Sequence, residues 1–224
     1  MTEVAMRHST QQDRPEIAFR RSEHDGSETL FIDGEQAMQA WEAALMRRSA
    51  AMLCACGQDF VEAGLGFGFS ALEIARADST RTHRVIEPYR EVINAFHAAH
   101  PVPPDNLEIV HADFFNYLAK LEPDAIDGIF FDPALPPSMW DDEPFWMEMI
   151  PHFARVVRPG GGVMPFFTSS PKLRARFARA FDRIVIERHA FTAYDHTNYT
   201  DVIEGDAYVQ LYTKGVKPLS ADAA

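Results

Sequence analysis

The chain has 224 residues, of which 46% are hydrophobic and 24% charged, and its formal net charge is −12. This length and composition fit one globular domain with a substantial core and exclude a disordered chain. The negative charge disfavours non-specific binding to nucleic acid and mildly favours a small or cationic partner.

The cysteines and histidines predict neither a disulfide scaffold nor a metal site. Cys54 and Cys56 are two positions apart, which suits neither a structural disulfide nor a zinc cluster, so we expect reduced thiols in a cytoplasmic protein. The nine histidines form no pair with metal-ligand spacing. No apolar run approaches the roughly 20 residues that span a bilayer, and the polar N-terminus lacks a hydrophobic signal region. The sequence does not indicate the oligomeric state.

The first part of the chain divides into an irregular segment, a short strand and a helix. Residues 1–28 are polar and without periodicity, so we expect a flexible segment or a lid. Residues 30–32 predict a short strand that ends at Asp33-Gly34. Residues 35–55 predict a helix with an apolar stripe at helical spacing. The stripe consists of Met38, Trp41, Leu45 and Met52.

From residue 58 onwards, strand-like and helix-like runs alternate. The alternation predicts an α/β domain with a mostly parallel sheet covered on both faces, and two late strands predict an antiparallel hairpin at one edge. A sharp turn is expected at 158–162 and an irregular loop at 192–206. The predicted strands are 58–63, 82–87, 107–111, 125–132, 163–167, 183–191 and 207–214, and the predicted helices are 68–77, 89–99, 142–157 and 171–181.

A glycine-rich junction follows the first of these strands. Residues 61–68 read Val-Glu-Ala-Gly-Leu-Gly-Phe-Gly, and helix-favouring residues come next. Glycines let the backbone adopt positive φ and let a ligand approach closely. Glu87 ends the following strand about twenty residues on, where a carboxylate can hold ribose hydroxyls. The combination indicates a nucleotide-like cofactor.

Acidic side chains stand at or just after the ends of four predicted strands. In open α/β sheets, ligands bind beyond the carboxyl ends of the strands. Four carboxylates at this edge are more than solubility requires, so we expect a binding site there. They are Glu62, Glu87, Asp113 and Asp132.

These motifs, with Arg158-Pro159-Gly160-Gly161, resemble those of class I S-adenosylmethionine-dependent methyltransferases over most of residues 58–214. Within that superfamily the chain resembles guanidinoacetate N-methyltransferases. Two segments carry this closer resemblance, 30–42 (Leu-Phe-Ile-Asp-Gly-Glu-Gln-Ala-Met-Gln-Ala-Trp-Glu) and 126–132 (Ile-Asp-Gly-Ile-Phe-Phe-Asp). The resemblance implies a Rossmann-like sheet of seven strands, mostly parallel, with an antiparallel C-terminal edge strand. It implies one domain over 29–214 and a tail at 215–224.

The resemblance also implies the acceptor site. Glu42 and Asp132 would hold a guanidinium group, and Met38 and Met46 would line the cofactor and methyl-transfer site. The spacing of Met38, Glu42 and Met46 would let one helix present all three from one face.

For the cofactor, S-adenosylmethionine, we expect Glu87 to bind the ribose and Asp113 to face the adenine amino group. Phe114 takes the position of an aromatic residue that packs near the adenine. The remaining expected residues form or support the loop beside the methionine portion. They are Glu62, Gly64, Gly66 and Gly68.

Carboxylates suit this chemistry because a guanidinium has no free lone pair and must lose a proton as its nitrogen attacks. They bind the planar group through paired hydrogen bonds and accept protons. We therefore expect Asp132 to orient the attacking nitrogen and take its proton, while Glu42 holds another edge of the group.

Two departures from the family pattern leave other reactions open. Ala43-Ala44-Leu45 and Pro133-Ala134-Leu135 replace family residues that shape the substrate pocket. The alternative is an O-methyltransferase, or a non-methyl alkyl transfer or cyclisation, on a small amino acid-like metabolite. Aminopropyltransferases share the fold, but their acidic Gly-Gly-Gly-Asp-Gly strand end does not occur here.

Overall fold

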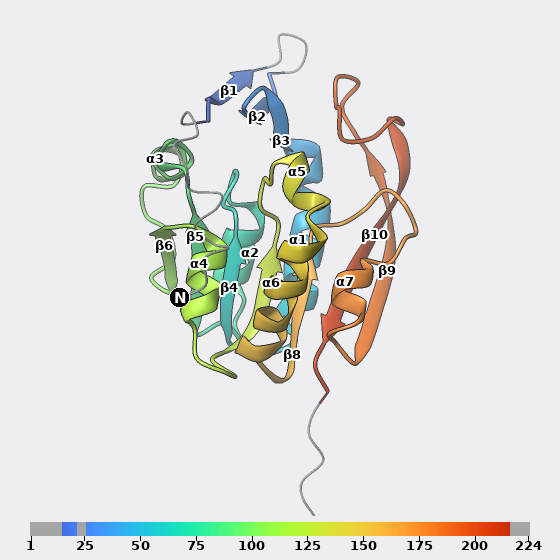
Figure 1. Cartoon of the computed structure of the whole chain (residues 1–224). Coiled ribbons are helices and arrows are strands. Elements are labelled where there is room, and N and C mark those ends of the chain that lie inside the picture. The colour runs from blue at the N-terminus through green and yellow to red at the C-terminus, as the bar shows by residue number, and fades with distance from the viewer. Residues whose placement is uncertain (1–14, 22–25, 216–224) are drawn as a thin grey trace, which may run out of the picture.

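A seven-stranded sheet with helices on both faces forms the body of the computed structural model, which describes residues 15–21 and 26–215 (Figure 1). Buried Val, Ile and Phe runs build its central strands, as expected of a sheet covered on both sides. The strands are β4 (Asp59–Ala63), β5 (Thr82–Glu87), β6 (Leu107–His111), β7 (Ile126–Phe131), β8 (Val157–Pro165), β9 (Arg183–Thr192) and β10 (Glu204–Thr213).

The sheet order is β6-β5-β4-β7-β8-β10-β9. The first five strands of this order pair in parallel, and β10 runs antiparallel to both β8 and β9. The predicted fold, mostly parallel with an antiparallel hairpin at one edge, is confirmed. The last strand of the chain is inserted beside β8, so that β9 is outermost.

The helices divide between the two faces of the sheet (Figure 1). Side chains of α1, α2 and α3 share one buried cluster, and those of α4, α6 and α7 share another with α5 packed against it. The helices are α1 (Ala43–Cys54), α2 (Phe69–Arg76), α3 (Arg90–Ala99), α4 (Phe114–Lys120), α5 (Pro137–Trp140), α6 (Glu143–Val156) and α7 (Ala175–Ala178).

A small antiparallel sheet crosses the carboxyl ends of the large one and corrects the prediction for the first part of the chain. Its strands are β1 (Ile17–Arg21), β2 (Glu28–Ile32) and β3 (Glu35–Gln39). Residues 17–21, within the stretch expected to be a flexible segment or a lid, form β1, while residues 1–14 and 22–25 lie outside the described part.

The helix predicted over 35–55 is wrong for its first eight residues. Residues 35–39 form β3, and η1 (Ala40–Glu42), a 3-10 turn, precedes α1. Asp33 and Gly34 both have positive φ, 53° and 79°, which is the two-residue Asp-Gly turn of a hairpin. The turn fixes β3 against β2 and overrides the helical spacing of Met38 and Trp41.

Two further predictions need correction. The helix expected at 171–181 is only the short α7, and the turn expected at 158–162 lies within β8. β8 accommodates these residues through a register shift against β7 between Ile126 and Gly128. The Pro-Gly-Gly-Gly run therefore makes a bulge in a strand and not a separate turn.

Candidate functional site

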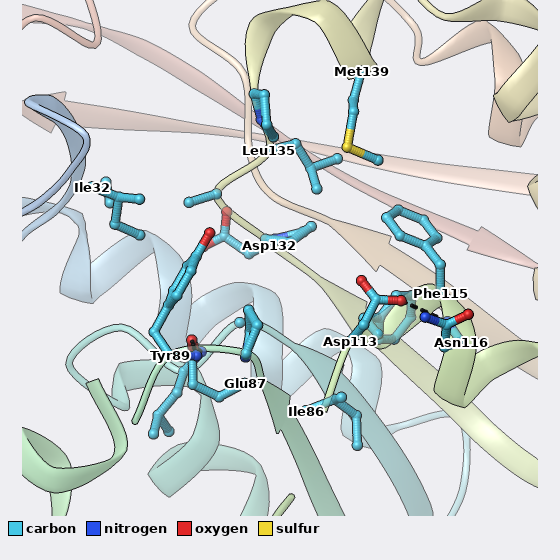
Figure 2. A pocket seen from close by; sticks show the side chains of 18 of the residues that line it. Ile32, Ile86, Glu87, Tyr89, Asp113, Phe115, Asn116, Asp132, Leu135 and Met139 are labelled. Atoms are coloured by element: carbon cyan, nitrogen blue, oxygen red, sulfur yellow. Dashed lines mark hydrogen bonds between the residues drawn. The ribbon is translucent and has the colours of Figure 1, made fainter. Parts of the chain in front are cut away.

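A cavity of about 640 Å³ opens at the carboxyl ends of β4, β5 and β7, beside β3. Figure 2 shows Glu87, Tyr89, Asp113 and Asp132 gathered around it. Its place agrees with the general rule for ligand sites in open α/β sheets. Seven of the predicted residues line it: Met38, Gly64, Gly66, Glu87, Asp113, Phe114 and Asp132.

The glycine loop brings β3, β4 and β7 into close contact. A Cβ on Gly64 would lie 2.6 Å from the carbonyl oxygen of Asp132, and one on Gly66 would lie 2.5 Å from Sδ of Met38. Both glycines have positive φ, so a side chain there would be strained as well as crowded. Gly68 instead packs against the Phe96 ring and does not line the cavity.

Met38 packs against the glycine loop. Its sulfur accepts a hydrogen bond from the Phe67 amide at 3.3 Å, and its side chain is 5% exposed. It lines the cavity from a strand, so the expected presentation of Met38, Glu42 and Met46 by one helix is wrong.

Glu87 is a buried carboxylate at the centre of the cavity wall. It accepts the Leu65 amide at 2.9 Å and the Tyr89 amide at 2.8 Å, and so it ties the glycine loop to the end of β5. Burial raises its pKa to about 7 against the effect of these two hydrogen bonds. Each oxygen keeps a lone pair that can accept a hydroxyl.

Asp113 and Phe114 begin α4 at the neighbouring strand end. Asp113 is exposed and accepts the Asn116 amide at 2.8 Å, which makes it the N-cap of α4. Phe114 is buried and lines the cavity beside it. Both positions suit the predicted roles near an adenine.

Glu62 lies beneath the site and not in its wall. It is 1% exposed, accepts a hydrogen bond from the Ser70 hydroxyl and stands 3.1 Å from Nε2 of His83, which is also buried. Ser70 belongs to α2, so Glu62 supports the helix that follows the glycine loop. Among the predicted roles, this placement fits support of the loop.

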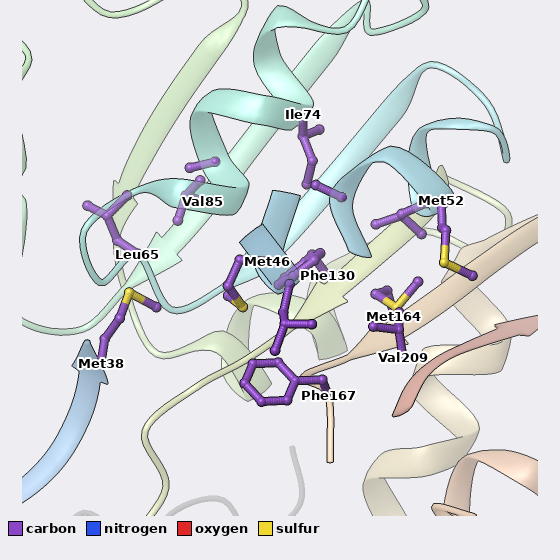
Figure 3. Close-up of a cluster of buried hydrophobic side chains, with 14 of the residues drawn as sticks. Met38, Met46, Met52, Leu65, Ile74, Val85, Phe130, Met164, Phe167 and Val209 are labelled. Atoms are coloured by element: carbon purple, nitrogen blue, oxygen red, sulfur yellow. The ribbon is translucent and has the colours of Figure 1, made fainter. Parts of the chain in front are cut away.

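Met46 lies in the hydrophobic core (Figure 3). It is 1% exposed and does not line the cavity. It packs on α1 with core residues of the sheet such as Phe130 and Met164. The predicted direct role of Met46 at the cofactor is therefore not supported by its position.

Glu42 and Asp132 form an acidic pair, although they come from distant segments. Glu42 is 7% exposed, and burial raises its pKa to about 8 against a hydrogen bond from the Gln39 amide. Burial also raises the pKa of Asp132 well above its usual range, and the nearby charges of Glu42 and Glu62 raise it further. The structure thus brings the two predicted acceptor-site carboxyl groups within electrostatic reach of each other.

Aromatic rings pack together around Trp41, which precedes Glu42 in the chain. Trp41 stands 5.9 Å from Phe167, 5.4 Å from Phe191 and 6.0 Å from Tyr199, centroid to centroid. Tyr199 also lies 6.2 Å from Phe166. Burial raises the pKa of Tyr199, and the charges of Asp132 and Glu42 add to this effect while Arg174 opposes it. We call these five residues the aromatic cluster.

The loop between β9 and β10 covers the aromatic cluster. Tyr199 donates its hydroxyl to the Phe167 carbonyl at 2.8 Å. Gln36 of β3 donates to Thr197 Oγ1 at 3.1 Å and accepts the Asn198 amide at 3.0 Å. Within this loop, Tyr199 lies within electrostatic reach of Asp132 and Glu42. Tyr194 and Asn198 line a separate small hollow, and His196 pairs with Asp195.

Several site residues escaped the sequence analysis. Tyr89 lines the cavity two positions after Glu87, so the strand-end rule could have found it. Phe145 and Met149 reach the cavity from α6, and Arg174 reaches the neighbourhood of Asp132 from the segment before α7. No local motif marks these three, because only the packing of distant elements brings them there.

The described residues include neither a metal-binding group nor a membrane-spanning helix. No group of three or more His, Cys, Asp or Glu could hold a metal ion. No helix among them is long and apolar enough to cross a membrane.

Comparisons with solved structures show the fold. A spermidine synthase bound to the transition-state analogue AdoDATO and the spermidine synthase of Thermotoga maritima each match with a TM-score of 0.66 at 16% identity, over 93% of this chain and 72% of theirs. A probable spermidine synthase from Corynebacterium glutamicum matches with a TM-score of 0.61 at 14% identity, over 96% of this chain and 82% of its own. At such identities the likeness concerns architecture alone.

Comparison with curated proteins gave no match. The family model described as Guanidinoacetate N-methyltransferase matches residues 12–174. This range contains the glycine loop, Glu87, both carboxylates of the acidic pair and the 30–42 segment. The chain therefore belongs to the guanidinoacetate N-methyltransferase family, and it is an S-adenosylmethionine-dependent N-methyltransferase that acts on a small guanidino compound.

Proposed function

We propose that the acceptor binds as a cation between Glu42 and Asp132, and that Asp132 takes the proton which the acceptor nitrogen loses. The observation that carries this proposal is the acidic pair itself. Two neighbouring carboxyl groups whose pKa values are both raised by burial form a site that a bound cation would stabilise. Such perturbed pairs are typical of functional sites.

The cavity residues fit S-adenosylmethionine. Glu87 offers a buried carboxylate to ribose hydroxyls, Asp113 and Phe114 stand where an adenine would lie, and Gly64 and Gly66 present backbone without side chains. When bound, the cofactor supplies a methyl group on a sulfonium, an electrophile that needs no further activation. The protein then has to position the acceptor and move one proton.

The proton that the reaction releases indicates a different role for each carboxylate of the acidic pair. A guanidinium that gains a methyl group must lose one proton in order to stay a monocation. Asp132 lies in the cavity wall, so its carboxylate can accept this proton. Glu42 lies outside the wall and is held by the Gln39 amide at 2.6 Å, so it orients the group without needing to exchange protons.

The aromatic cluster supports a planar cationic head on the acceptor. A guanidinium stacks on aromatic faces and pairs with carboxylates through its edges. Trp41 is fixed for this because its indole N–H donates to Gln39 Oε1 at 2.9 Å. We propose a guanidino acceptor as a class, since Ala43–Leu45 and Pro133–Leu135 differ from the family pattern, and a small molecule in preference to the polyanion nucleic acid.

The test is turnover of a panel of guanidino compounds, amines and amino acids with S-adenosylmethionine, followed by mass spectrometry. A product heavier by one methyl group on a guanidino nitrogen is expected, and it should vanish in Asp132→Asn and weaken in Glu42→Gln. Full activity in both variants would remove the proposed roles. Methylation at oxygen, or transfer of a different alkyl group, would support the alternative reaction.

We also propose that the segment before residue 29 acts as a lid over the glycine loop. Phe19 of β1 lies 6.2 Å from Phe67 of that loop, centroid to centroid, and remains 38% exposed. Closure over a ligand would bury it and exclude water. Limited proteolysis with and without S-adenosylmethionine should show protection of this segment, and identical cleavage would argue against the lid.

A cytoplasmic location is the remaining proposal. Cys54 and Cys56 are both free, and burial raises the pKa of Cys56 to about 11, which keeps it an unreactive thiol. Free thiols are typical of a reducing compartment. Microscopy of a tagged chain in its own cells would decide it.

A further inference from the structure

Arg174 is a mostly buried cation with no ion-pair partner in the described part of the chain. Its Nη2 donates to the carbonyls of Phe166 and Phe167 at 3.2 and 3.3 Å, and its guanidinium stacks 4.0 Å from the centre of the Phe166 ring. Its Nε is buried without a hydrogen-bond partner. A desolvated charge that is only partly satisfied is costly, so its presence calls for an explanation.

The strand register places this guanidinium beside Asp132. Phe131 of β7 is paired with Pro165 of β8, and the Phe166 amide donates to the Phe131 carbonyl at 3.0 Å. Asp132 and Phe166 therefore lie side by side at the ends of adjacent strands. Since Arg174 stacks on Phe166 and donates to its carbonyl, it stands next to Asp132.

The backbone of Arg174 is held independently of its side chain. Its amide donates to the Tyr212 hydroxyl at 2.9 Å and to Gln210 Oε1 at 3.3 Å. Gln210 and Tyr212 are buried residues of β10. The guanidinium is thus presented from a rigid support, and a change of the side chain need not move the chain.

Four groups face Asp132 from the elements around it. Glu42 comes from η1 and Glu62 from β4, and both raise its pKa, while Arg174 lowers it. Tyr199, from the loop between β9 and β10, is affected by the charges of Arg174, Asp132 and Glu42. Arg174 is therefore the one positive charge in this set of described residues.

We propose that Arg174 is a positioning residue that serves as the resident counter-charge of Asp132 and keeps this carboxylate able to accept a proton. The proposal rests on the proposed role of Asp132. Before the acceptor binds, two ionised carboxylates without a cation would repel each other in a site with little water. The fixed guanidinium offsets one of them and leaves one negative charge for a monocationic acceptor.

The test compares Arg174→Met, which removes the charge, with Arg174→Lys, which keeps it. Arg176→Met is the matched control, because Arg176 lies two positions on, stacks on Trp146 and pairs with the exposed Glu143. Protein labelled with ¹³C at aspartate carboxyls is titrated by NMR, with the Asp132 signal assigned from Asp132→Asn. In Arg174→Met the midpoint of Asp132 should rise by about one pH unit, in line with loss of one nearby opposite charge.

The two other variants fix the interpretation. Arg174→Lys and Arg176→Met should keep the wild-type midpoint, and calorimetry should show unchanged affinity for S-adenosylmethionine in all three. An unchanged Asp132 midpoint in folded Arg174→Met overturns the proposal. If Arg174→Met does not fold, a midpoint raised by about one unit in Arg174→Lys overturns it, and a wild-type midpoint there supports it.

Turnover gives a second readout. The acid limb of the kcat/KM profile should move to higher pH in Arg174→Met, while an equal loss of activity at every pH would indicate a merely structural role and overturn the proposal. If the wild type methylates no acceptor, the proposed function fails, and the NMR titration still decides the role of Arg174. If the wild type is active and Asp132 titrates unchanged in Arg174→Met, only the present inference fails.

Discussion

The proposed cofactor half and the proposed acceptor half of the site are built in opposite ways. The cofactor half is an open cavity of about 640 Å³ whose main polar groups come from three consecutive strand ends, β4 to β6. The proposed acceptor half combines Asp132 in the cavity wall with the buried Glu42. It draws on η1, the ends of β7 and β8, the segment before α7 and the loop between β9 and β10.

This difference indicates which half of the site can change during evolution while the fold is kept. A cofactor site made of neighbouring strand ends is fixed by the fold, because parallel strands must end together at one edge. An acceptor site made of distant loops can change with little effect on the sheet. Of the two departures from the family pattern, Pro133–Leu135 line the cavity next to Asp132, and Ala43–Leu45 begin α1 directly after Glu42.

Asp132→Asn gives the strongest test of whether the two halves of the site act separately. We expect methyl transfer to fall by about 10² to 10⁴-fold, the range for loss of a general base, while the affinity for S-adenosylmethionine changes little. Single-turnover rates and calorimetry measure the two effects. Asp141→Asn, in an exposed position, serves as the control. An equal loss of cofactor affinity would mean that the two halves are not separable.

Glu87→Gln should act on the other half. The amide cannot accept from both the Leu65 and Tyr89 N–H groups as the carboxylate does, so we expect a loss of about 10 to 100-fold in cofactor affinity. In the wild type the affinity should weaken as pH falls below about 7, where Glu87 takes up a proton. Calorimetry at several pH values tests this, with Glu108→Gln as the exposed control. A flat profile contradicts it.

Glu42→Gln tests whether ionisation of the buried Glu42 destabilises the folded protein. The pKa of Glu42 is raised from 4.5 to about 8, so the folded protein keeps this proton between those values while the unfolded chain releases it. The free energy of unfolding of the ligand-free wild type should therefore decrease as pH rises from 5 to 8.

The Gln variant lacks this titration and still accepts the Gln39 amide. It should be more stable than the wild type at pH 8 by roughly 3 to 4 kcal/mol and near it at pH 5, since the shift of the Glu42 pKa is worth about 1.4 kcal/mol per unit. Urea unfolding measures this, with exposed Glu35→Gln as the control. Equal pH slopes in wild type and Glu42→Gln would show that Glu42 stays ionised.

Gln36→Ala should give the smallest effect, because it removes only the hydrogen bonds between β3 and the loop over the aromatic cluster. Each is worth about 1 kcal/mol. We expect faster hydrogen exchange at Asn198 and Tyr199 and a few-fold change in the acceptor KM, with cofactor affinity unchanged. Glu35→Ala on the same strand is the control. Unchanged exchange would show that Gln36 does not hold the loop.

Local patterns predicted most of the sheet and most of the cofactor half. Runs of apolar residues, the glycines after β4 and the carboxylates at strand ends are signals within a few residues, and the structure brings Gly64, Gly66, Glu87 and Asp113 to one cavity. The same patterns failed where two readings competed. Residues 35–39 carry helical spacing, but the Asp33-Gly34 turn and pairing with β2 make them a strand.

By itself, the sequence determined the seven strands of the large sheet and the glycine loop and proposed the two carboxylates of the acidic pair, because each depends on residues close in the chain or on a family segment. Only the tertiary structure decided that Met46 is core, that Glu62 lies beneath the site and that Arg174 and Tyr199 stand beside Asp132. The physical reason is that burial and Coulomb interaction depend on distance in space. These distances depend on how β8, β10 and the loop before β10 pack around η1. No short window of sequence contains all of these elements.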